Sequence, residues 1–319
     1  MKDHAPILSA RRIDLSLLLL LFGGGILLRI LLLTPTGFDG LYGQDAYAYY
    51  DFAGELRAAI SQGRAPQPFF WPLGYPALSA AAQIVFGTQA TSAQAINITM
   101  GAALAPLVYV LARQMGMGGF GALIAGILMT VCGQAIQSSL VIMADIPALF
   151  WATVSATILW IYLANPPRPR SEALLAIVAL TLALASVTRW LYLALIVPWS
   201  MALLIVWRGR IHWRASLLAI GAALLIFLPQ LAYSRTNPYP VLNHVWVEGW
   251  SPANIFRQVF DNVDGHFEYE KLNALYYAQP FYDAYYLAPV FTPFLLLGLW
   301  RLLREKRFAP LLLLLGMWI

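Results

Sequence analysis

The chain has 319 residues, of which 60% are hydrophobic and 11% charged, and its formal net charge at pH 7 is +5. Because ordinary globular domains carry about 25% charged residues, this composition excludes a water-soluble fold. The basic residues lie in short clusters between apolar runs, where membrane proteins carry orientation signals, so the positive charge does not indicate a nucleic-acid partner. Inside a bilayer the backbone must satisfy its own hydrogen bonds, and we therefore expect an all-α, polytopic bundle of transmembrane helices.

Apolar runs long enough for a helix to cross a hydrocarbon core of ~30 Å recur along the chain. The first follows Arg11 and Arg12 and is too long for a typical signal peptide, so we expect it to be retained. The final run begins at Phe308 and is too short for a span, which predicts one transmembrane domain over residues 1–319 that is incomplete at its C-terminus. The predicted spans before that run are 13–33, 96–113, 118–139, 146–164, 172–187, 190–207, 215–233 and 285–300.

The distribution of basic residues predicts the orientation of the chain. If the N-terminus is cytoplasmic, 13 of the 20 lysines and arginines lie in inside segments. This arrangement requires that the apolar run from Trp71 to Gly87 dip into the outer leaflet without crossing, because a crossing would invert every later loop. Arg29 and Arg189 then lie near outer helix ends, where their long stems can snorkel to the surface. We expect a multi-pass protein of the cell (inner) membrane.

Two large loops remain on the outer side, residues 34–95 and 234–284. The first contains a predicted surface helix from Asp45 to about Ser61, which Gly63 ends. Its apolar residues share one face at helical spacing, so the helix should lie along the membrane. That face consists of Tyr49, Phe52, Ala53, Leu56 and Ile60.

Two acidic residues near outer helix ends are candidates for chemistry. Asp45 either faces the interface as a functional carboxylate or acts as the N-cap of the surface helix, and the two roles are compatible. Asp145 stands alone in an apolar context, where an ionisable group is costly enough to indicate a function. The alternative is that Asp145 caps the following helix, with Pro147 in the first turn.

Three arginines are candidates for binding a phosphate. Arg189 lies at an outer helix junction, where its guanidinium suits a phosphate or lipid headgroup, or else anchors the interface. Arg57 and Arg64 are similar candidates, although solvated loop arginines are common. The single cysteine, Cys132, is interpreted as a packing residue. Phosphate-binding glycine loops and the common hydrolase and zinc motifs are missing from the sequence.

The order of these features resembles the GT-C membrane glycosyltransferases. The first helix is followed by Gly-Gln-Asp-Ala-Tyr-Ala-Tyr-Tyr at 43–50 and by Trp-Pro-Leu-Gly-Tyr-Pro-Ala-Leu at 71–78. The resemblance continues through 104–113, Asp145 and Thr188-Arg189. The most similar branch is that of the protein O-mannosyltransferases and the bacterial aminoarabinose transferases.

The resemblance implies an inverting glycosyltransferase that takes a sugar from a polyprenyl-phosphate donor on the outer side of the membrane. The acceptor would be a hydroxyl of a lipid, glycan or protein. By the family pattern Asp45 is the catalytic base and Asp145 a second acid, while Arg189 is suited to stabilise the leaving phosphate. Many relatives carry Asp-Glu at the first site, but Ala46 follows Asp45 here, so a divalent metal is possible and no cofactor is certain.

Aromatic residues of the two outer loops either stack on sugar faces or anchor the protein at the interface. These residues are Trp71, Tyr75, Trp246 and Trp250. A transporter or flippase of a lipid-linked sugar is an alternative function, although such proteins tend to have ionisable residues nearer the bilayer midplane. A further alternative is that the chain is a non-catalytic partner in a cell-envelope complex.

Overall fold

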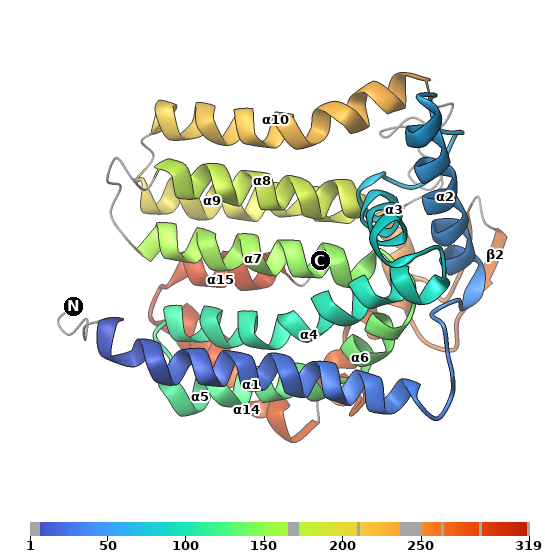
Figure 1. Ribbon diagram of the computed structural model, residues 1–319. Coiled ribbons are helices and arrows are strands. Elements are labelled where there is room, and N and C mark those ends of the chain that lie inside the picture. The colour runs from blue at the N-terminus through green and yellow to red at the C-terminus, as the bar shows by residue number, and fades with distance from the viewer. Residues whose placement is uncertain are drawn as a thin grey trace.

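The computed structural model describes residues 7–164, 172–208, 211–236, 251–262, 265–286 and 289–317. Its long helices run side by side in one bundle, and two further helices lie across one end (Figure 1). We call this the capped end. Among the described residues, four helices are long and apolar enough to span a membrane: α1 (Ile7–Leu33), α4 (Ala90–Gln114), α7 (Asp145–Ala164) and α10 (Trp213–Thr236). The prediction of an all-α, polytopic membrane bundle is confirmed.

One predicted span is broken. Residues 118–139 form α5 (Gly119–Val131) and α6 (Gly133–Leu140), which meet at Cys132 with a bend of 48°. A β-carbon at Gly133 would lie 2.8 Å from the carbonyl oxygen of Tyr285, so the chain packs closely against Tyr285 where the helix breaks. Such a pair is either a broken span or a re-entrant segment.

The remaining apolar helices are shorter. They are α8 (Glu172–Thr188), the 3-10 helix η2 (Trp190–Leu195) that runs into α9 (Ile196–Val206), α14 (Thr292–Arg304) and α15 (Phe308–Gly316). The helix predicted at 285–300 begins only at Thr292, after the 3-10 turn η4 (Pro289–Phe291). Pro293 explains this late start, because proline is favoured in the first turn of a helix and unfavourable in its interior.

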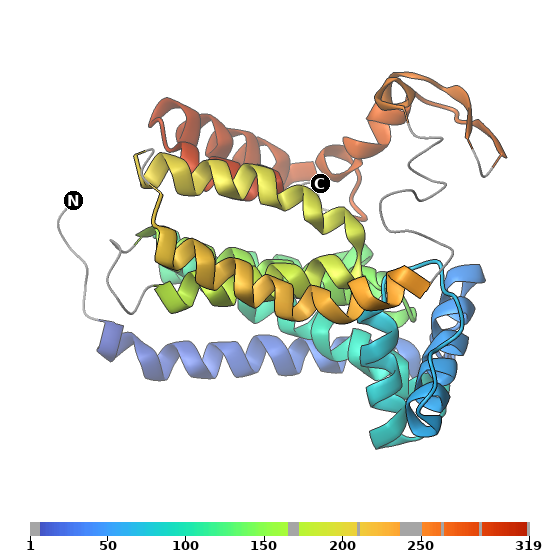
Figure 2. The ribbon, with the colours of Figure 1, turned by 90° about the horizontal axis from the view of Figure 1, so that it is seen from above.

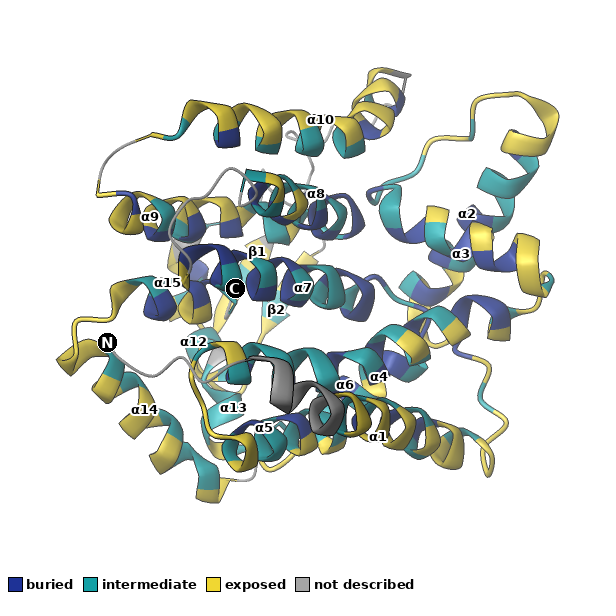
Figure 3. Ribbon diagram, turned by 60° about the vertical axis from the view of Figure 1, so that its left-hand side comes forward, coloured by how far each residue is buried: buried dark blue, intermediate teal, exposed yellow. Residues whose placement is uncertain are grey.

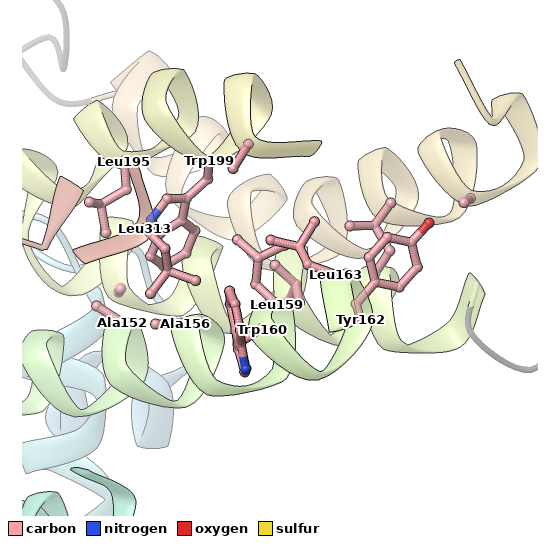
Figure 4. Packing of buried hydrophobic residues seen from close by; sticks show 14 of the residues in the cluster. Ala152, Ala156, Leu159, Trp160, Tyr162, Leu163, Leu195, Trp199 and Leu313 are labelled. Atoms are coloured by element: carbon pink, nitrogen blue, oxygen red, sulfur yellow. The ribbon is translucent and has the colours of Figure 1, made fainter. Parts of the chain in front are cut away.

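The bundle interior lies around α7, which is the most enclosed of the four long spans. Alanines at 152 and 156 let α7 approach its neighbours closely, while Leu195, Trp199 and Leu313 fill the space from η2, α9 and α15 (Figure 4). In contrast, α1 and α10 lie at the edge of the bundle and expose large apolar side chains along much of their length (Figure 3). In a membrane these faces meet lipid.

Helices α2 (Gly43–Gln62) and α3 (Gly74–Phe86) cover the capped end and lie across the bundle axis (Figure 2). The segment from Trp71 to Gly87 therefore does not run along the bundle as the spans do, as predicted. The predicted surface helix is confirmed, and Gly63 ends it in the left-handed conformation. Of its predicted apolar face, Tyr49, Phe52 and Ala53 are buried in the protein, whereas Ile60 is 64% exposed.

The second large loop lies at the same end of the bundle as α2 and α3 (Figure 2). Its described elements are η3 (Pro252–Phe256), β1 (Val259–Asn262), β2 (Gly265–Glu268), α12 (Asn273–Tyr277) and α13 (Gln279–Tyr282). The two strands form an antiparallel hairpin in which Val259 lies opposite Glu268. Trp246 and Trp250 lie outside the described residues.

The snorkelling prediction for Arg29 is wrong. Its side chain is fully buried because α4 and α6 pack against α1 at this level, and its guanidinium donates a hydrogen bond to the Gly25 carbonyl of its own helix at 3.0 Å. A β-carbon at Gly101 of α4 would lie 3.3 Å from its Nε atom. Arg29 is therefore enclosed by helices in the C-terminal half of α1.

Candidate functional site

The sequence treats Asp145 and Arg189 as separate candidates, and the fold joins them in an ion pair. Asp145 is the first residue of α7, and Arg189 lies between α8 and η2. The Arg189 guanidinium donates to a carboxylate oxygen of Asp145, and the two side chains are 42% and 37% exposed. This half-exposed pair lies at the capped end of the bundle, where α7 begins and α8 ends. Asp145 therefore lies in the first turn of α7 and is also paired with a cation.

Asp45 does not cap α2. The helix begins two residues earlier than predicted, at Gly43, and its N-cap is Tyr42, so Asp45 is the third helical residue. A carboxylate in this first turn is favoured by the helix dipole. Asp45 is partly exposed, and within the described part of the chain it forms no ion pair or hydrogen bond through its side chain. Its carboxylate is therefore available to a ligand.

Tyr49 shows where the three charged candidates lie relative to one another. It lies one turn after Asp45, and its ring is almost fully buried. Burial raises the pKa of the Tyr49 phenol well above its usual range, and the charges of Arg189, Asp145 and Asp45 all act on it. Ala46 and Tyr49 pack in one cluster with Ala144, so the fold brings the start of α2, where Asp45 lies, close to the start of α7.

Aromatic rings fix Tyr49 and hence the start of α2. Tyr49 stacks on Trp71 with ring centroids 6.2 Å apart and meets Tyr75 edge to face at 5.1 Å. Phe69 completes the cluster at 5.9 Å. Tyr75 is fully buried, which makes its ring a support for α2 and removes it from contact with a sugar. Trp71 remains partly exposed.

Two polar residues of α4 hold the segment that leads to Asp145. Asn97 accepts a hydrogen bond from the Tyr75 hydroxyl at 2.8 Å and donates to the carbonyls of Val141 and Met143 at 2.8 and 2.7 Å. Gln94 donates to the carbonyls of Phe38 and Leu140 at 3.2 and 2.8 Å. Neither residue was predicted from the sequence. The pattern that could have identified them is the presence of two amides in one apolar helix, which is costly unless both form hydrogen bonds or have a function.

We expect Asn97→Leu to destabilise the protein by about 3 kcal/mol, because it leaves two buried carbonyls and the Tyr75 hydroxyl without partners, each worth roughly 1–3 kcal/mol. Tyr75→Phe should cost only about 1 kcal/mol, since Asn97 keeps both carbonyl bonds. Thermal unfolding in detergent measures both effects. Thr99→Val is the matched control, because its hydroxyl bonds only the Ala95 carbonyl on an exposed face of α4. An Asn97→Leu variant as stable as this control would contradict the assignment.

Arg57 and Arg64 lie in the last turns of α2 and just beyond it, away from the charged site. Arg64 holds Glu55 with two guanidinium nitrogens, the second at 2.8 Å. The hydrogen bond from Arg64, aided by the Gln67 backbone amide, lowers the pKa of Glu55 to about 2. Arg64 therefore forms a surface ion pair with Glu55 within the first large loop. The Nε atom of Arg57 is buried and has no hydrogen-bond partner among the residues that the structure describes.

A cavity of about 680 Å³ opens beside the ion pair. Asp145 and Arg189 line it together with polar residues of α6 and several tyrosines, and Asp45 lies outside this lining. Among the described residues no cluster of three or more histidines, cysteines, aspartates or glutamates could hold a metal ion. The arrangement offers an anion site at Arg189 and a free carboxylate at Asp45 near it.

A family model of the dolichyl-phosphate-mannose-protein mannosyltransferases matches residues 72–239, which is more than half of the chain and includes Asp145 and Arg189. The chain belongs to this family. No curated protein sequence matches it.

Three solved structures share the fold of the chain. ArnT from Cupriavidus metallidurans bound to undecaprenyl phosphate has a TM-score of 0.61 and 16% identity and covers 98% of this chain. The S. cerevisiae O-mannosyltransferase Pmt1-Pmt2 bound to the sugar donor has a TM-score of 0.53 and 17% identity, and covers 77%. Archaeal oligosaccharyltransferase AglB from Archaeoglobus fulgidus, in complex with an inhibitory peptide and a dolichol-phosphate, has a TM-score of 0.53, 20% identity and 69% coverage.

The chain spans 54%, 36% and 29% of these three chains, respectively. At such identities the similarity shows the fold alone. The match to the mannosyltransferase family model, together with this shared fold, confirms the resemblance to the GT-C membrane glycosyltransferases.

Proposed function

We propose that the chain is an inverting glycosyltransferase that moves a sugar from a polyprenyl-phosphate donor to a hydroxyl of a lipid, glycan or protein at the outer face of the membrane. The observation that carries this proposal is the Asp145–Arg189 pair, which lines a cavity at the capped end with the free carboxylate of Asp45 nearby. Membership of the mannosyltransferase family and the polyprenyl phosphates bound to two of the solved relatives support it.

The residues suit a single displacement. The Asp45 carboxylate accepts the proton of the acceptor hydroxyl as the oxygen attacks the anomeric carbon from the face opposite the phosphate. The bond between that carbon and the phosphate oxygen breaks, and polyprenyl phosphate leaves with the bonding electrons. Arg189 donates charge-assisted hydrogen bonds to the departing phosphate, so a general acid is not required. Asp145 orients the Arg189 guanidinium.

The test is transfer of a labelled sugar from a polyprenyl-phosphate sugar to a hydroxyl acceptor by the purified full-length chain in lipid nanodiscs. The bent α5–α6 pair favours the alternative of a flippase, because broken helices often form transport sites. Reconstituted vesicles separate the two. An enzyme releases polyprenyl phosphate and labels the acceptor, whereas movement of intact donor between leaflets without any transfer would establish the flippase and end the proposal.

We expect the capped end to face outward. Single cysteines at Gln67, beside α2, and at Gln114, at the opposite end of α4, are placed in a Cys132→Ser background and exposed to an impermeant thiol reagent. In intact cells position 67 should react, and position 114 should react only after permeabilisation, because the predicted inside segments hold most of the basic residues. The reverse pattern would invert the orientation and move the site to the cytoplasmic side.

A further inference from the structure

Cys132 lies at the break between α5 and α6, where it is the N-cap residue of α6. The first backbone amides of a helix have no carbonyl partner within the helix and carry partial positive charge. Of the amides at the start of α6, that of Gln134 donates to the Tyr285 carbonyl at 3.3 Å. The positive end of the α6 dipole therefore lies at Cys132.

A second positive charge acts on Cys132 from α1. The side chain of Arg29 is fully buried, yet its Nε and Nη2 atoms have no hydrogen-bond partner among the described residues. None of the ion pairs that the described residues form includes it. Its guanidinium interacts favourably with the thiolate form of Cys132. Because a buried charge without a counter-charge is costly, Cys132 stabilises Arg29 when its sulfur is anionic.

Helix packing directs the Cys132 side of α6 toward Arg29. A β-carbon at Gly101 of α4 would collide with the Ser139 hydroxyl and would lie 3.3 Å from the Arg29 Nε atom, so Ser139 and Arg29 meet at the same point of α4. Cys132 precedes Ser139 by about two helical turns and therefore lies on the same side of α6. Helices α1 and α6 are in contact.

Cys132 is also accessible from the cavity beside the Asp145–Arg189 pair. It lines this cavity of about 680 Å³ and is itself only half-buried. A cysteine that solvent can reach, at a helix N-terminus and beside a guanidinium, is in the environment typical of reactive thiols. A cysteine that serves packing alone would lie away from both the charge and the cavity.

We propose that Cys132 is a reactive thiol that exchanges with small disulfides entering the cavity, and that the adduct closes the cavity to the donor lipid. The thiol loses its proton to solvent, and the thiolate sulfur attacks one sulfur of the reagent. The S–S bond of the reagent breaks, a new S–S bond forms at Cys132, and the other half leaves as a thiolate with the bonding electrons. The exchange does not depend on the proposed function, whereas its effect on donor binding rests on it.

The first test measures the rate at which glutathione disulfide adds to the full-length chain in nanodiscs, followed by intact mass. Cys132 is the single cysteine of the chain, so one adduct is expected. The matched control is Ser138→Cys in a Cys132→Ser background, because Ser138 is also half-buried and lines the same cavity from α6. The native thiol should react at least about tenfold faster than the thiol of this control.

Arginine 29 supplies the second comparison. Arg29→Met should slow the reaction of Cys132 by about tenfold and leave the rate of the control thiol unchanged. Arg29→Lys keeps the charge and should preserve most of the native rate. A native rate no faster than that of the control thiol would overturn the reactive site. A rate that Arg29→Met leaves unchanged in a folded preparation would do the same.

The last test measures polyprenyl phosphate binding before and after treatment with glutathione disulfide. Affinity should fall at least about tenfold in the native chain, return when dithiothreitol removes the adduct, and stay constant in Cys132→Ser. An adduct that leaves affinity unchanged would overturn the closure of the cavity. Failure of the untreated chain to bind polyprenyl phosphate would overturn the proposed function and the closure with it, while the adduct rates would still decide the reactive site.

Discussion

Replacing Asp45 with asparagine is expected to lower sugar transfer by at least ~10², which corresponds to roughly 2.7 kcal/mol of transition-state stabilisation. Asparagine keeps the size of the side chain but cannot accept the proton of the acceptor hydroxyl. The fold should survive, because Tyr42 and not Asp45 is the N-cap of α2. Donor binding should also survive, because Arg189 is unchanged. Initial rates at saturating donor, with thermal unfolding of the same preparations, measure both effects.

The matched control for Asp45 is Asp51→Asn, which removes an exposed carboxylate from the same helix. It should leave transfer within about twofold of the native rate. If the Asp45→Asn variant turns over at a rate close to that of this control, Asp45 is not the base. The assignment of the chain to the family would stand, and the proton acceptor would have to be sought elsewhere at the capped end.

Replacing Arg189 with methionine is expected to reduce kcat/KM for the donor lipid by about 10²–10³, the usual cost of losing one donor to a charge that develops in the transition state. Methionine keeps much of the length and removes the charge. Arg189→Lys should fall between the native and methionine variants, because lysine keeps the charge without the planar fork. Asp145→Asn should lose less than Asp45→Asn, since an amide oxygen can still accept a hydrogen bond from Arg189.

The matched control for Arg189 is Arg235→Met, which removes an exposed guanidinium from the last turn of α10. Its effect should be small, and the small effect of a surface cation should vanish at high salt. Binding of polyprenyl phosphate provides the second measurement. Unchanged affinity and unchanged transfer in the Arg189→Met variant would leave the Asp145–Arg189 pair with a structural role only, and the phosphate site would then lie at another cation.

Local patterns in the sequence were sufficient to predict the class of the protein and most of its helices. The length of an apolar run and its helical period are properties of one segment, and the bilayer requires each span to be a helix. This is why the surface helix at α2 and its end at Gly63 could be predicted. The failure of the segment after Trp71 to span was predicted instead from the distribution of basic residues over the whole chain. A local pattern does not specify burial within the protein, because Ile60 fits the helical period and is nevertheless 64% exposed.

The neighbours of each residue were decided only by the tertiary structure. Asp145 and Arg189 are 44 positions apart, and no local pattern connects the start of α7 with the end of α8. The burial of Arg29 and the bonds of Asn97 likewise depend on which faces of α1 and α4 meet other helices. The sequence by itself determined that charged and polar residues stand near helix ends. Packing decided which of them meet, because hydropathy specifies the depth of a residue in the membrane and leaves open the direction in which its side chain points.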